Sequence, residues 1–174
     1  SLFVSGCEHQ CKGCYNQSTW RLDSGHLFTQ EMSDRVITDL NDTKVRRRGL
    51  SLSGGDPLHP ANLADILALV TRVRNECPGK DIWCWTGYRL DELTQDQLSV
   101  VELVDVPIDG KFIAEIADPS LVWRGSSNQI IHEFDRSDAW WQQNSQSIGT
   151  SQLSTLSCST GEHRVTDQPV PRPC

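Results

Sequence analysis

Apolar residues in the first two thirds of the chain alternate between short continuous runs and longer stretches with helical spacing. The short runs read as buried strands, because each is only a few residues long. They lie at 2–4 (LFV), 49–53 (GLSLS), 81–86 (DIWCWT) and within 103–112 (LVDVPIDGKF).

The stretches between these runs have the 3.6-residue spacing of amphipathic helices. The first apolar face consists of Met32, Val36, Ile37 and Leu40. The second helix has Asn62 as its candidate N-cap and "CPG" at 77–79 as its stop signal. Its apolar stripe comprises Leu63, Ile66, Leu67, Val70 and Val73. Residues 90–103 carry a third helical pattern.

Strand, loop and helix repeated in this order predict an α/β fold with parallel strands, because parallel neighbours need a crossover that is usually a helix. Ligands of such folds gather at the C-terminal ends of the strands. The segments that follow the predicted strands are therefore the candidate site: the cysteine-rich loop from residue 7, residues 54–57, residues 87–88 and residues 110–111.

The two ends of the chain differ from this central part. The chain enters an apolar run directly after Ser1, so we expect that an N-terminal segment is missing. Between residues 135 and 174, sixteen of forty residues are Ser, Thr or Gln, a composition that cannot bury enough apolar area to offset its ordering entropy. We therefore predict one folded domain over residues 1–134 and a polar, disordered tail over 135–174.

Charge and hydropathy exclude some function classes. A formal net charge of -7 and a pI near 5.1 argue against a protein that neutralises many phosphates, so no nucleic-acid partner is expected. No run approaches the roughly 18 apolar residues that a membrane span needs, and no signal-peptide pattern opens the chain. We expect a cytoplasmic protein without a membrane partner.

Three cysteines stand close together with the spacing C-x3-C-x2-C, flanked by Gly6 and Gly13. Disulfides fit poorly, because the number of thiols in the cluster is odd. One alternative is a structural zinc site of Cys3His type with His9, and another is a ferredoxin-like carrier, which would need a fourth thiolate. Three thiolates suit a [4Fe-4S] cluster that leaves one iron open to a cofactor. The ligands would be Cys7, Cys11 and Cys14.

Further motifs accompany this loop in a fixed order. The cysteine loop followed by "GGDP" resembles the radical S-adenosylmethionine superfamily. More narrowly, the chain from residue 1 to about 132 resembles the activating proteins of anaerobic ribonucleoside-triphosphate reductases, a family of glycyl-radical-enzyme activating enzymes. The segments that carry this resemblance are "CKGCYNQSTW" (11–20), "LSLSGGDPLHP" (50–60), "DIWCWTGY" (81–88), "DGKF" (109–112) and "DPSLVWRGSSNQ" (118–129).

The resemblance implies a fold and a reaction. The chain is short for the superfamily, so a partial (β/α) barrel of parallel strands is expected, open on one side. The cluster would bind S-adenosyl-L-methionine at its free iron and cleave it reductively to methionine and a 5'-deoxyadenosyl radical. That radical would take a hydrogen atom from a glycine of the large reductase subunit, leaving a glycyl radical. A reduced flavodoxin-type protein would supply the electron. A different glycyl-radical enzyme is the alternative substrate.

The resemblance also assigns residues to S-adenosylmethionine. Gly13, Cys14 and Tyr15 would lie against it, with the Tyr15 ring available to adenine. The loop of Gly54, Gly55 and Asp56 would contact the methionine ammonium, although a tight turn is its simpler reading. Asp109 and Lys111 resemble an element whose lysine reaches the cofactor carboxylate, with an exposed turn as the alternative.

Two other groups of residues receive no direct role in the chemistry. Residues 124–129 are rich in hydrogen-bond donors and could line the cofactor site or satisfy their own loop. Trp83 and Trp85 alternate with Cys84 along a strand, and we expect them to pack in the core.

Overall fold

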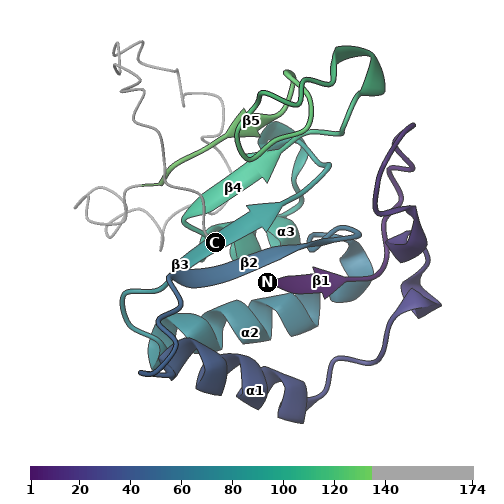
Figure 1. The fold of residues 1–174 in the computed structure, drawn as a ribbon. Coiled ribbons are helices and arrows are strands. Elements are labelled where there is room, and N and C mark those ends of the chain that lie inside the picture. Colours follow the sequence, from purple (N-terminus) through teal and green to yellow (C-terminus); the bar gives the residue numbers. More distant parts are fainter. Residues whose placement is uncertain (135–174) are drawn as a thin grey trace.

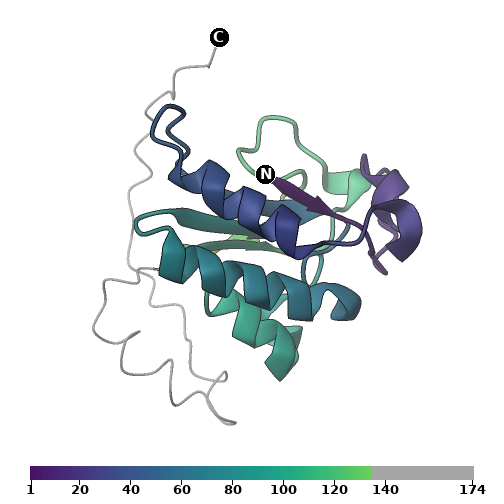
Figure 2. The same cartoon turned by 90° about the horizontal axis from the view of Figure 1, so that it is seen from below.

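The computed structural model describes residues 1–134, which form one five-stranded sheet with three helices on one of its faces (Figures 1 and 2). The predicted tail, 135–174, lies outside the described residues. The strands are β1 (Leu2–Val4), β2 (Gly49–Gly54), β3 (Asp81–Trp85), β4 (Val106–Asp109) and β5 (Ile130–Ile131). The helices are α1 (Gln30–Asn41), α2 (Leu63–Glu76) and α3 (Gln95–Val101). Short 3₁₀ turns occur at Gln17–Thr19, Leu22–Ser24, Pro60–Asn62, Leu90–Glu92 and Ala114–Ile116.

The strands follow one another across the sheet in the order β1-β2-β3-β4-β5. The first four are mutually parallel, which confirms the predicted α/β class. β5 was not predicted, and it pairs antiparallel with β4. It returns through a loop without a crossover helix, and an antiparallel neighbour does not need one. This strand order is compatible with part of a (β/α) barrel, but one sheet does not establish a barrel, so the partial barrel stays a prediction.

The third helix is shorter than its sequence pattern indicated. The helical pattern covers 90–103, whereas α3 begins only at Gln95. The start is set by a capping box, in which the Thr94 hydroxyl accepts from the Gln97 backbone N–H and the Gln97 side chain accepts from the Thr94 N–H. The longest helix in residues 1–134 has 14 residues, and none there is long and apolar enough to cross a bilayer.

The hydrophobic core lies between the sheet and the helices. Leu50 and Leu52 of β2 and Ile82 and Cys84 of β3 point toward the helices and are buried. From α2, the core receives Ile66, Leu69, Val70 and Val73. From α1 it receives Ile37 and Leu40.

The predicted apolar face of α1 was wrong at one position. Met32 is 40% exposed, because the buried face of the helix begins at its neighbour Ser33 and continues through Ile37 and Leu40. Residues 33, 37 and 40 have the i, i+4, i+7 spacing of one helical stripe, and Met32 lies beside that stripe.

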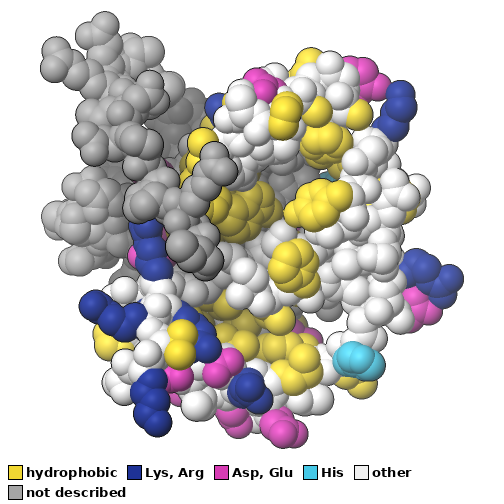
Figure 3. Space-filling model, in the orientation of Figure 1, with side chains coloured by type: hydrophobic (Ala, Val, Ile, Leu, Met, Phe, Trp, Pro, Cys, Tyr) yellow, Lys and Arg dark blue, Asp and Glu magenta, His cyan; other side chains and the backbone are white. Residues whose placement is uncertain are grey.

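The opposite face of the sheet carries aromatic side chains. Trp83 and Trp85 alternate with the buried Cys84 and so point away from the helices, with their rings stacked at 5.8 Å. The Trp123 ring lies 5.3 Å from that of Trp83. The two β3 tryptophans are therefore partly buried on the helix-free face, not in the core where we expected them. In Figure 3, hydrophobic side chains surround a hollow in the middle of the molecule.

The central position of Leu52 gives a test of this layering. Leu52 is fully buried between the sheet and the helices, so Leu52→Ala should lower the free energy of unfolding by about 2–5 kcal/mol. Leu27 is 89% exposed, and Leu27→Ala should change it by less than about 0.5 kcal/mol. Urea unfolding followed by circular dichroism measures both; equal effects would contradict the assigned core.

Candidate cluster and cofactor site

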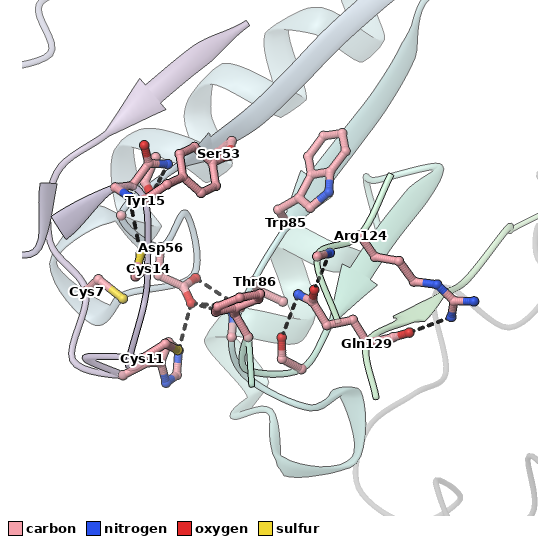
Figure 4. A pocket seen from close by; sticks show the side chains of 18 of the residues that line it. Cys7, Cys11, Cys14, Tyr15, Ser53, Asp56, Trp85, Thr86, Arg124 and Gln129 are labelled. Atoms are coloured by element: carbon pink, nitrogen blue, oxygen red, sulfur yellow. Dashed lines mark hydrogen bonds and ion pairs between the residues drawn. The ribbon is translucent and has the colours of Figure 1, made fainter. Parts of the chain in front are cut away.

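A cavity of about 380 Å³ opens where the parallel strands end, which is where the fold rule placed the candidate site (Figure 4). Its walls come from the cysteine loop after β1, the Ser53–Asp56 loop after β2, the Trp85–Gly87 segment at the end of β3, and residues between 110 and 129 after β4. Segments far apart in sequence thus meet because their strands are neighbours in the sheet.

The three candidate cluster ligands line this one cavity. Cys7, Cys11 and Cys14 are free thiols and each is partly buried. Figure 4 shows them together on one side, across the cavity from Arg124 and Gln129. Burial raises the pKa of the Cys7 thiol, although the backbone N–H groups of His9 and Gln10 act in the opposite direction. Cys14 Sγ accepts a hydrogen bond from the Asn16 N–H at 3.4 Å.

Backbone hydrogen bonds fold the cysteine loop back on itself. The N–H groups of Gly6 and Cys7 donate to the carbonyls of Thr19 and Trp20 at 2.8 and 2.9 Å. Three residues of the loop have positive φ angles: Gly6 with 96°, Gln10 with 48° and Gly13 with 78°. Glycine adopts this region freely, whereas a glutamine there is uncommon.

The Gly54–Gly55 pair lets the loop after β2 touch the cysteine loop. The Gly55 N–H donates to the Val4 carbonyl at 2.8 Å, and the Asp56 N–H donates to the Gly6 carbonyl at 2.7 Å. A Cβ at position 54 would lie 2.5 Å from the Val4 oxygen, and one at position 55 would lie 2.5 Å from the Gly6 oxygen. Both glycines are therefore needed for this approach, whatever ligand the cavity holds.

Asp56 follows the glycines and is 1% exposed. Its carboxylate accepts hydrogen bonds from the Leu58 N–H, the Thr86 hydroxyl, the Gly87 N–H and the His9 ring, all between 2.8 and 3.0 Å. It thereby joins the loops after β1, β2 and β3.

Asn62, the predicted N-cap of α2, also forms hydrogen bonds with these loops. Its side chain makes no capping hydrogen bond to the helix. The amide group donates instead to the carbonyls of Ser5 and Asp56, at 2.9 and 3.0 Å. Asn62 therefore ties the end of β1 to the loop after β2.

Three of the predicted cofactor residues do not line the main cavity. The Asp109 carboxylate is buried, accepts from the Leu90 N–H at 2.9 Å and lies 3.3 Å from the His132 ring. Burial alone would raise its pKa, but these two contacts outweigh burial and hold the pKa below its usual range. Lys111 lines an adjoining hollow together with Glu8, Tyr88 and Glu92. Gly13 lies near Phe112 and Ala114. Tyr15 does line the cavity, and it is 87% exposed.

Comparison with known proteins agrees with this geometry. Residues 1–132 match the family described as "4Fe-4S single cluster domain". The chain is 66% identical over 132 residues to the anaerobic ribonucleoside-triphosphate reductase-activating protein of Salmonella typhi, covering 76% of this chain and 86% of the relative. It is 64% identical over 132 residues to the protein of that name from Escherichia coli strain K12, again covering 76% of this chain and 86% of the relative. For the one from Enterobacteria phage T4, the identity is 43% over 141 residues, covering 81% and 86%.

The chain belongs to the family of anaerobic ribonucleoside-triphosphate reductase-activating proteins. No solved structure resembled the chain significantly.

This member of the activating-protein family lines its cavity with several residues that sequence reasoning missed. Trp85, at the end of β3, donates from its indole N–H to the Trp123 carbonyl at 2.7 Å and so holds the 118–129 segment at the cavity. Phe112 also lines it. The available signal was position, because Trp85 ends a parallel strand. Arg124 and Gln129 line the cavity too, and they belong to the donor-rich segment 124–129 that the sequence offered as a possible part of the cofactor site.

The donor set of the activating-protein chain fits an iron–sulfur cluster. Thiolates are the usual ligands of such clusters, and three are present in one cavity. Within residues 1–134, no three His, Cys, Asp or Glu side chains are arranged around a single ion. A cubane cluster does not need such convergence, because each thiolate binds a different iron. The zinc alternative, with His9 as its fourth ligand, would need these side chains to converge on one ion, and within residues 1–134 they do not.

The approach of the two loops can be tested with a pair of glycines. Gly54 and Gly79 both have positive φ, but only a side chain at position 54 would meet the backbone of Val4; nothing lies within 4 Å at position 79. Gly79→Ala should cost about 1–2 kcal/mol of unfolding free energy for the left-handed angle alone. Gly54→Ala should cost about 1–3 kcal/mol more. Equal losses in urea unfolding would show that the loops do not need their close contact.

Proposed function

We propose that this chain binds a [4Fe-4S] cluster through Cys7, Cys11 and Cys14 and, with S-adenosyl-L-methionine, activates an anaerobic ribonucleoside-triphosphate reductase. The observation that carries the proposal is that three thiols, and not four, line one cavity in a member of this family. Cys77 and Cys84, the other cysteines within residues 1–134, are buried in the core instead.

The cluster, when bound, would supply the electron that cleaves S-adenosylmethionine to methionine and a 5'-deoxyadenosyl radical, which then takes a hydrogen atom from a glycine of the reductase. The chain's own contribution is to hold and orient the reactants and to exclude water. Cys7, Cys11 and Cys14 anchor one side of the cavity. Trp85, Phe112 and Trp123 provide apolar surface in the same cavity.

The size and lining of the cavity support S-adenosylmethionine as its ligand. A volume of about 380 Å³ lies in the range of small-molecule sites. The backbone of Gly54 and Gly55 is the proposed contact of the methionine part. Cys14 and the exposed Tyr15 ring are the proposed neighbours of the adenosyl part, with Gly13 shaping the turn that carries them.

Asp109 and Lys111 enter the proposal in different ways. Lys111 lines the adjoining hollow, and we propose that its long side chain reaches the cofactor carboxylate from there. The carboxylate of Asp109 is already occupied by the Leu90 N–H and the His132 ring. Its proposed part is therefore to position the Gly110–Lys111 turn.

The proposed protein substrate is the large subunit of the reductase that the relatives' names contain. The helix-free face beside the cavity carries exposed apolar side chains, including Phe3 and Trp123. A partial barrel open on this side would admit a loop bearing a glycine. A reduced flavodoxin-type protein is the proposed electron donor.

Anaerobic reconstitution tests the proposal directly. The purified protein is supplied with iron and sulfide, its metal content and visible absorption are measured, and dithionite and S-adenosylmethionine are added. We expect 5'-deoxyadenosine as a product, and a glycyl radical in electron paramagnetic resonance once the large reductase subunit is present. A centre containing zinc, or no cleavage by an iron-loaded protein, would overturn the proposal.

Single cysteine variants distinguish the cysteines that bind the cluster from those that do not. Cys11→Ala should reduce 5'-deoxyadenosine formation by more than about tenfold, because the cluster loses an anchor. Cys77→Ala is the matched control: it removes the same thiol from a residue that lies outside the cavity. It should retain iron and activity at a modest cost in stability. Full activity of Cys11→Ala would refute the ligand assignment.

A further inference from the structure

We propose that His9 and Asp56 form a positioning pair that holds the middle of the cysteine loop, and that Asp56 acts on the cluster site through His9 and not by contacting the methionine ammonium. This inference rests on the proposed function, because it concerns how the cluster ligands are oriented. It assigns a role to His9, which lies between Cys7 and Cys11 and is not itself one of the proposed ligands.

His9 is held tightly although it belongs to a surface loop. Its side chain is 5% exposed, and Nε2 lies 2.8 Å from Asp56 Oδ2. The Asp56 carboxylate serves as the acceptor, so this contact corresponds to the ring form in which Nε2 donates. The ring also stands edge-on against Tyr88, with centroids 4.5 Å apart, and packs onto Gly87, where a Cβ would collide with it. The ring therefore has one defined position.

The acceptor capacity of Asp56 is already used by the protein. Both oxygens receive two or more hydrogen bonds, from Leu58, Thr86, Gly87 and His9. Asp56 is 1% exposed, so a ligand ammonium could reach its carboxylate only by displacing one of these donors. The carboxylate is thus arranged as an internal junction between three loops.

The residue after His9 shows why the loop needs to be held. Gln10 has φ 48°, a strained conformation for a non-glycine residue that persists only where the surrounding structure imposes it. Gln10 lies between His9, which is bonded to Asp56, and Cys11, which lines the cavity. Without the bond to Asp56, the segment could relax its backbone, and the positions of Cys7 and Cys11 in the cavity wall would be less well fixed.

The test uses His9→Phe, Asp56→Asn and the double variant. Phenylalanine keeps a ring against Tyr88 and Gly87 but removes the donor. His26→Phe, at an exposed histidine, is the matched control. Each protein is reconstituted anaerobically; iron loss to a chelator, the electron paramagnetic resonance spectrum of the reduced cluster and the dissociation constant for S-adenosylmethionine are measured. Thermal unfolding of the cluster-free proteins shows whether each variant folds.

Each single variant should lose iron about tenfold faster than the wild type and show the same altered spectrum before S-adenosylmethionine is added. The double variant should be no worse than either single one, since the two residues act as one unit. Gly87→Ala, which displaces the His9 ring without removing a donor, should behave in the same way and replaces His9→Phe if that variant does not fold.

The outcomes distinguish this inference from the proposed function. A wild type that holds no iron–sulfur cluster overturns the proposed function and this inference with it. A wild type that holds the cluster, together with His9→Phe that matches it in iron loss and spectrum, overturns the positioning pair alone. Asp56→Asn that weakens S-adenosylmethionine binding but retains iron normally would show that Asp56 contacts the cofactor instead.

Discussion

The cavity depends on the close backbone approach between the cysteine loop and the loop after β2. β1 and β2 pair in parallel with Val4 opposite Gly54. Beyond the strand ends, the Gly55 and Asp56 N–H groups continue this contact by donating to the carbonyls of Val4 and Gly6. The two glycines leave no side-chain volume between the chains. The position of the cysteine loop therefore follows from the sheet, and the side chains around Asp56 refine it.

The main elements of this arrangement could be predicted from sequence because they depend on local patterns. Short apolar runs separated by helical stretches predicted the four parallel strands and the helices between them. Ligands gather where parallel strands end, and this rule predicted from the sequence that the cysteine loop and the Gly54–Asp56 loop lie close together. β5 escaped prediction because two residues are too few to show a period.

The features that could not be predicted depend on contacts between distant parts of the chain. Strand alternation showed that Trp85 and Cys84 face opposite sides, but not which side the helices would cover. The acids at 56 and 109 were recognised as candidate ligand contacts by type, but apart from Leu58 the partners of these carboxylates lie 19 to 47 residues away in sequence. From sequence alone, a carboxylate that binds a ligand cannot be distinguished from one that accepts all its hydrogen bonds from the protein, because the hydrogen-bond partners are not yet known.

Because the helices cover only one face of the sheet, the residues that form the core differ from those that line the cavity. Within residues 1–134, none of the side chains in the core cluster lines the cavity. Leu52 and its neighbours pack toward the helices, whereas Trp85 and Trp123 face the other way. Exposed side chains of the reacting face that do not hold the loops together, such as Tyr15 and Trp123, can consequently vary with little penalty in foldedness, so such a scaffold can acquire new partner preferences while its interior stays unchanged.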